Sequence, residues 1–169
     1  AEVCPVQSNP RLVDAVRRDA ALSARLVPGL VLSATMLHER GSADELERMV
    51  AGGVRALRAF PVSFRQRLRH LEPLLARLMK YRPVLFVDVR QTPDERDVCE
   101  LAERFPALPI VCMEAMWGHL LPVYDAMRRC PNVHVETSWL HTHGTIEYLC
   151  REFGAGRVVF GAGRRAMNG

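Results

Sequence analysis

The sequence has almost no lysine, and it lacks long apolar runs. Lys80 is the single lysine among 23 basic residues, and the arginines occur singly or in pairs. No basic stripe with interleaved aromatics is present, so nucleic acid is not an expected partner. The charge-free stretch from Leu26 to Leu37 contains Ser33 and Thr35. It is too short and too polar to span a bilayer, so we expect no membrane partner.

Paired cysteine motifs and a leader are also missing. The five cysteines form no C-x-x-C pair, and no basic, apolar segment opens the chain. We therefore expect reduced thiols and a cytoplasmic location. Cys99 and Cys150 lie on apolar helix faces, and we interpret them as small buried hydrophobes. The chain begins with Ala1 and ends at Gly169 in a glycine-rich segment, so we expect a piece of a longer protein.

What is present is an ordinary globular composition. The 169 residues are 49% hydrophobic and 25% charged, with a net charge of +4. Glycine and proline, at 11 each, are too few for a linker or a disordered segment. The length predicts one domain, residues 1–169, with enough apolar material for a core.

Strands and helices alternate regularly along this domain. Apolar, β-rich runs recur roughly every 25 residues, and each interval contains one helical pattern. These runs start near Leu26, Val54, Val84, Ile110, Val133 and Val158. Strands linked by single helices must be parallel. The even repeat favours an α/β fold of the (β/α)8 TIM-barrel type, of which about six βα units are present. An open doubly wound sheet is the alternative.

One motif favours that alternative. The segment from Gly161 to Ala166 matches G-x-G-x-x-A after a strand, the skeleton of a dinucleotide fingerprint. It falls on the last strand rather than the first. Neither a helix nor an acidic residue follows it to complete the fingerprint.

Several segments resemble the amidohydrolase-related family of metal-dependent hydrolases and decarboxylases, which are (β/α)8 barrels. They occur in the family's order and cover most of the chain from Ser42 onward. The two most specific are Cys130-Pro-Asn-Val-His-Val-Glu-Thr-Ser138 and Phe153-Gly-Ala-Gly-Arg-Val-Val-Phe-Gly161. The others are Asp44–Arg48, Gly53–Pro61, Arg82–Asp88 and Leu101–Val111.

The resemblance implies a divalent metal, typically zinc, held by histidines and an aspartate at strand ends. Carried over residue by residue, the fifth-strand histidine falls at Val87, the sixth-strand histidine at Glu114 and the eighth-strand aspartate at Gly163. The usual ligands are therefore absent from this chain. The cofactor, and any metal-binding residues, stay undefined by the sequence.

The carboxyl ends of the strands carry the candidate catalytic groups. Functional groups of such barrels gather there, and Asp88 and Glu114 each interrupt an otherwise apolar strand. A buried carboxylate is costly unless it is paired or coordinated. Acid–base or metal chemistry is one interpretation, and a salt bridge to Arg58 or Arg90 is the other. We expect these four residues to form one polar cluster at the barrel mouth.

Further residues at these ends are candidates for binding a small anionic substrate. Arginine forks suit carboxylates, and an indole ring suits a planar ligand. The substrate-binding candidates are Arg58, Arg90, Trp139, His141, His143 and Arg164. His141 and His143 have the spacing of a metal pair but lie in a loop, where packing or helix capping is the alternative.

Two functional classes follow. The leading interpretation is a metal-dependent hydrolase or decarboxylase with a divergent metal site, acting on a small anionic molecule. The alternative is a non-catalytic relative that binds a small ligand or a protein partner. Because a partial barrel exposes sheet edges, a homo-oligomer is also expected.

Overall fold

A parallel sheet is the framework of the molecule. The computed structural model describes residues 4–94 and 96–161. Within these residues the strands are β1 (Gly29–Leu32), β2 (Ala56–Ala59), β3 (Val84–Asp88), β4 (Ile110–Met113), β5 (Val133–Glu136) and β6 (Val158–Val159). Each strand pairs in parallel with the next, in the order β1 to β6. This sequential order confirms barrel-type winding, because a doubly wound sheet reverses its order at a switch point.

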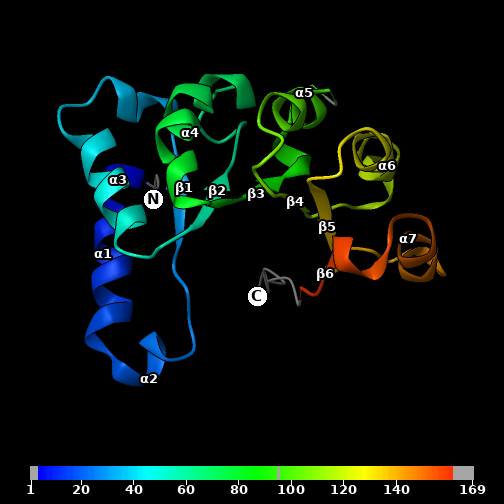
Figure 1. The fold of residues 1–169 in the computed structure, drawn as a ribbon, viewed down its shortest axis with the longest axis horizontal. Coiled ribbons are helices and arrows are strands. Elements are labelled where there is room, and N and C mark those ends of the chain that lie inside the picture. Colours follow the sequence, from blue (N-terminus) through cyan, green and yellow to red (C-terminus); the bar gives the residue numbers. More distant parts are fainter. Residues whose placement is uncertain (1–3, 95, 162–169) are drawn as a thin grey trace, which may run out of the picture.

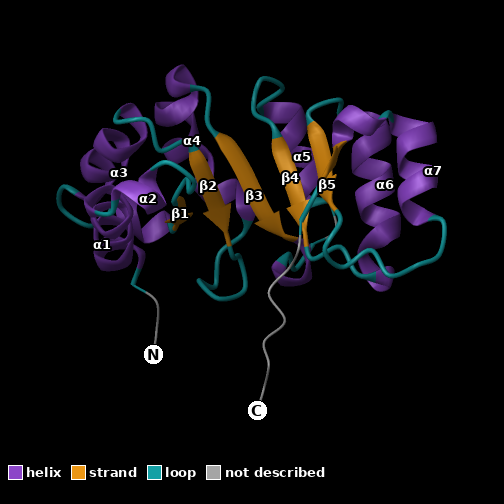
Figure 2. Ribbon diagram, turned by 90° about the horizontal axis from the view of Figure 1, so that it is seen from below, coloured by secondary structure: helices purple, strands orange, loops and turns teal. Residues whose placement is uncertain are grey.

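Helices cover the outer side of the sheet. Figure 1 shows the strands following an arc, with α3 to α7 along its convex side and the concave side open; Figure 2 shows the same layers from below. The α-helices are α1 (Pro5–Arg18), α2 (Ala20–Ser23), α3 (Ser42–Ala51), α4 (Glu72–Leu78), α5 (Asp97–Arg104), α6 (Leu120–Arg129) and α7 (Thr145–Phe153). The 3-10 turns are η1 (Ala34–Leu37), η2 (Leu68–Leu71), η3 (Met79–Tyr81), η4 (Val89–Gln91), η5 (Trp117–His119) and η6 (Ala155–Arg157).

The core lies between the sheet and the helices. Side chains alternate between the two faces of a strand, and one set is completely buried. In register across the sheet, this set includes Leu30, Leu57, Leu85, Ile110 and Val133, each 0% exposed. The alternate set faces the concave side and contains polar groups. It includes Val31, Arg58, Phe86, Val111 and His134.

The first two strands begin later than their apolar runs. β1 starts at Gly29 rather than near Leu26, and β2 starts at Ala56 rather than near Val54. Pro28 has no N–H to donate to a sheet ladder, and Leu26 is 51% exposed ahead of it. The apolar run that begins at Leu26 is therefore longer than strand β1.

The arc is not closed into a full barrel. In the described part of the chain, β1 and β6 are the two ends of the sheet and do not pair with each other. This arrangement agrees with a partial barrel of six βα units. Among the helices of residues 4–94 and 96–161, none combines the length and apolar character needed to cross a bilayer.

Candidate functional site

A cleft of about 500 Å³ runs along the concave face of the sheet. It extends from Gly29 and Ala56, where β1 and β2 begin, to Glu114 and Ser138, just past the ends of β4 and β5. Arg58 lines it between these two ends. The cleft therefore reaches the carboxyl edge of the sheet, where barrel enzymes place their chemistry.

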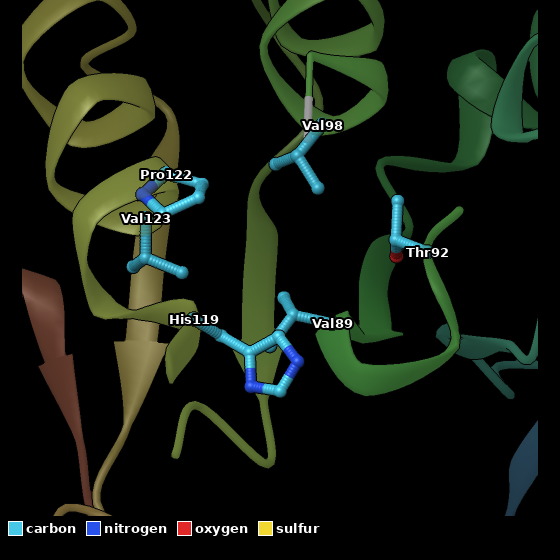
Figure 3. Close-up of a pocket in the computed structure, with 6 residues that line it drawn as sticks. All are labelled: Val89, Thr92, Val98, His119, Pro122 and Val123. Carbon is cyan, nitrogen blue, oxygen red and sulfur yellow. The ribbon is translucent and has the colours of Figure 1, made fainter. Parts of the chain in front are cut away.

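A smaller cavity lies outside the sheet and is a poorer candidate. Figure 3 shows Val98 of α5 and Val123 of α6 beside it, with the His119 ring at one end. Its volume is about 40 Å³ and its lining is largely apolar. The Nδ1 atom of His119 is buried without a hydrogen-bond partner in the described residues. A space of this size holds a few waters at most, so we assign the candidate site to the concave cleft.

Asp88, Arg90 and Glu114 form a connected group at the ends of β3 and β4. Asp88 is 3% exposed. Its Oδ1 accepts a hydrogen bond from the Arg90 backbone N–H at 3.1 Å, and its Oδ2 accepts one from Gln91 Nε2 at 3.0 Å. The Arg90 guanidinium lies 3.5 Å from Asp88 Oδ1 and 3.2 Å from Glu114 Oε2. Arg90 therefore bridges the two carboxylates.

Arg58 does not join this group, contrary to the predicted four-residue cluster. Its Nη2 donates to Met113 Sδ at 3.6 Å, and its guanidinium lies 5.0 Å from the centre of the Phe60 ring. No carboxylate in residues 4–94 and 96–161 forms an ion pair with it. The sheet register explains the error. Arg58 pairs with Phe86, two residues before Asp88, which is about 6.6 Å along the strand.

A turn brings Arg90 to this group. A continuous strand would place Phe86, Asp88 and Arg90 on one face, because side chains alternate along a strand. The strand ends at Asp88, and Arg90 lies in the turn η4 that the Asp88 side chain caps. The turn, rather than strand alternation, directs the guanidinium toward Glu114.

Glu114 has an unusual backbone and an unusual environment. Its φ of 59° lies in the left-handed region, which non-glycine residues adopt rarely and often at functional sites. The side chain is 20% exposed. Burial raises the pKa of Glu114 above its ordinary range, against the opposing effect of Arg90. The neighbouring carboxylates of Asp88 and Glu136 raise the pKa further.

The Glu136 side chain is held by hydrogen bonds to the loop that follows β5. Its Oε2 accepts a hydrogen bond from the Ser138 hydroxyl at 2.7 Å, and its Oε1 accepts one from the Ser138 N–H at 2.5 Å. A Cβ added at Gly161 would collide with the Glu136 carboxylate. A larger residue at this position, just past β6, therefore requires the Glu136 side chain to shift.

Aromatic residues of the same loop lie beside Arg90. The Arg90 guanidinium is 5.6 Å from the centre of the Trp139 ring, and the His141 ring meets that indole edge-on at 5.5 Å. Trp139 Nε1 is buried without a hydrogen-bond partner in the described part of the chain. His141 and His143 are exposed.

Two further sequence signals have different outcomes. Arg164 and most of the G-x-G-x-x-A segment lie outside the described residues. His134, in contrast, was not among the predicted site residues. The alternation Val-His-Val-Glu in β5 places His134 and Glu136 on the same concave face. That alternation was the signal that could have identified it.

The residues present do not fit the metal site that the resemblance implies. Val87 is 0% exposed and belongs to the helix-facing core. Glu114 is a possible ligand, and Gly163 lies outside the described residues. Among the described residues, a cluster of three potential ligands occurs at Cys99, Glu103 and Cys130, which are not at the mouth. One carboxylate does not build a tetrahedral zinc site, so we derive no chemical step through a metal.

A parallel, sequentially wound sheet with outer helices and a polar concave cleft defines a partial (β/α)8 barrel. The family model described as amidohydrolase matches residues 8–163, so the chain belongs to the amidohydrolase family. Among solved structures, an uncharacterized TIM-barrel protein from Bordetella bronchiseptica is similar, with a TM-score of 0.69 and 18% identity. The match covers 88% of this chain and 58% of that protein. At this identity the likeness shows the fold alone. The curated proteins gave no match.

Proposed function

We propose that the concave cleft binds a small anionic molecule and that Glu114 transfers a proton to or from it, in a hydrolysis or decarboxylation reaction. The observation that carries this proposal is the position of the Arg58 side chain. Its guanidinium lines the cleft and has no carboxylate partner in the described residues. A guanidinium fork of this kind recognises a carboxylate or phosphate through charge-assisted hydrogen bonds.

Glu114 supplies the acid–base part of the proposal. It lines the same cleft as Arg58. Because burial raises the pKa of Glu114, the carboxyl holds its proton closer to neutral pH than an exposed glutamate does. Arg90 and Asp88 position this group and complete its charge environment. Asp88 accepts hydrogen bonds from its own turn, and we assign it a positioning role.

The binding part is tested with malonate and inorganic phosphate as probes. Isothermal titration calorimetry compares the unmodified chain with Arg58→Gln and with Arg69→Gln, an exposed arginine on η2. We expect Arg58→Gln to weaken binding about 10- to 100-fold, the loss of a hydrogen bond to a charged group. Arg69→Gln should bind as the unmodified chain does. Equal binding by both variants would contradict the proposal.

Catalysis is distinguished from binding alone by Glu114→Gln. Turnover is measured with carboxylate-bearing lactones and amides for hydrolysis, and with β-keto and aromatic acids for decarboxylation. An enzyme that uses Glu114 loses turnover in this variant and still binds malonate. If the unmodified chain binds malonate but converts none of these compounds, the non-catalytic alternative is favoured, which is a ligand-binding relative of the family.

A further inference from the structure

A second group of chemically reactive side chains lies far from the mouth, in the helical layer. Cys99 and Glu103 are one turn apart on α5, and Cys130 directly follows α6, shortly before β5. Cys99 Sγ is 3.5 Å from Cys130 Sγ and 3.7 Å from Glu103 Oε1. All three potential ligand atoms lie within 4.8 Å of one another. The proposed function uses none of these residues.

These separations are those of a metal-binding tetrahedron. With zinc–sulfur bonds of about 2.3 Å, two thiolates at tetrahedral angles lie about 3.8 Å apart, and a thiolate and a carboxylate oxygen about 3.5 Å apart. The observed 3.5 and 3.7 Å require only small side-chain adjustments. A disulfide would require the sulfur atoms to approach to about 2.05 Å.

Charge and access also suit a cation. Two thiolates, one carboxylate and a divalent cation carry a net charge of −1. Arg129 Nη2, which lies 2.6 Å from Glu103 Oε1, neutralises that charge. Cys99 and Arg129 line a cavity of about 160 Å³ between α5 and α6. This cavity gives an ion a route to sulfur atoms that are otherwise buried.

We propose that Cys99, Cys130 and Glu103 bind a thiophilic divalent cation of the zinc class, with a fourth position open to the α5–α6 cavity. Binding replaces the two thiol protons, which pass to solvent, so no oxidant or reductant is involved. The ion joins α5 to the segment that leads into β5.

The test uses cobalt(II), then zinc(II), titrated into the reduced chain without oxygen. Tetrahedral cobalt bound to thiolates has intense d–d bands and a sulfur-to-metal charge-transfer band. We expect both to saturate at one equivalent and to vanish when zinc is added. The variants are Cys130→Ser, which removes one sulfur, and Glu103→Gln, whose side chain is 47% exposed in the unmodified chain. Cys150→Ser is the matched control on α7.

The expected pattern separates the site from adventitious binding by thiols. Cys130→Ser should lose the charge-transfer band, and Glu103→Gln should weaken affinity by at least about tenfold. Cys150→Ser should behave as the unmodified chain does. The proposal is overturned if the reduced chain gives no thiolate band, or if Cys150→Ser reduces the band as much as Cys130→Ser. An unchanged cobalt affinity in Glu103→Gln would show that the Glu103 carboxylate is not a ligand of the metal. These outcomes do not depend on ligand binding in the concave cleft.

Discussion

Glu114 combines a left-handed backbone with a carboxylate held among charges. Its φ is 59°, and its neighbours include Arg90 at 3.2 Å and the carboxylates of Asp88 and Glu136. Two like charges nearby and partial burial together outweigh the single arginine. The environment therefore favours the protonated form of Glu114.

The pH dependence of stability follows from that preference. The folded state binds the Glu114 proton more tightly than the unfolded chain, whose pKa is near 4.5. The stability this contributes is complete below pH 4.5 and is lost as the pH rises through the folded-state pKa. Each tenfold difference in proton affinity corresponds to about 1.4 kcal/mol of unfolding free energy.

Glu114→Gln should therefore gain stability relative to the unmodified chain as the pH rises. We expect the difference in melting temperature, variant minus unmodified chain, to be larger at pH 7 than at pH 4. Thermal unfolding followed by circular dichroism across this range measures the difference. A relative stability of the variant that falls with rising pH would show that Arg90 outweighs burial and the neighbouring carboxylates.

At the level of elements, the Asn9 side chain of α1 forms hydrogen bonds with the outer edge of β1. Asn9 is 2% exposed. Its Oδ1 accepts a hydrogen bond from the Val31 N–H and its Nδ2 donates one to the Val31 carbonyl, both at 2.9 Å. The amide thus takes the place of a neighbouring strand at this residue. Such covering limits pairing with other chains at a sheet edge.

Asn9→Ala should loosen this contact. The substitution leaves the Val31 N–H and carbonyl without partners in a partly buried position. We expect a loss of about 1–3 kcal/mol for each unsatisfied group, measured by urea denaturation. Gln7→Ala, an exposed position on the same helix, is the control and should change little. Equal losses in both variants would mean that the side chain of Asn9 contributes nothing specific.

At the scale of the whole molecule, the other end of the sheet is less covered. β6 consists of two residues, and Phe160, which follows it, is 86% exposed. Backbone groups on the outer side of β6 are available for pairing within the described part of the chain. An exposed edge beside an apolar ring favours association with a second copy.

We therefore propose that the 169-residue chain self-associates through β6. Sedimentation velocity at increasing concentration should show a dimer, and Phe160→Lys should shift it toward monomer, because a charge at an edge opposes pairing. Leu121→Lys is the control, since Leu121 is 68% exposed on α6, away from the edge. A chain that stays monomeric throughout, or a dimer lost equally in both variants, would refute this interface.

The sheet and its winding were predictable from the sequence, but the site was predictable only in part. The predicted pairing of Asp88, Arg90 and Glu114 agrees with the structure. The predicted contact of Arg58 with a carboxylate was wrong, because the register between β2 and β3 offsets Arg58 from Asp88 by two residues. The local sequence pattern also did not indicate the capping turn η4 or the left-handed backbone of Glu114.

The alternation of strand and helix, and hence the parallel order of the sheet, follows from the amino-acid sequence alone. Those features depend on apolar periodicity and on one helix per crossover, both of which are local. Which distant side chains meet depends instead on the packing of the folded chain. Cys99 and Cys130, 31 residues apart, come within 3.5 Å because α5 packs against α6. Register and helix packing are set by the whole core, so no single segment encodes them.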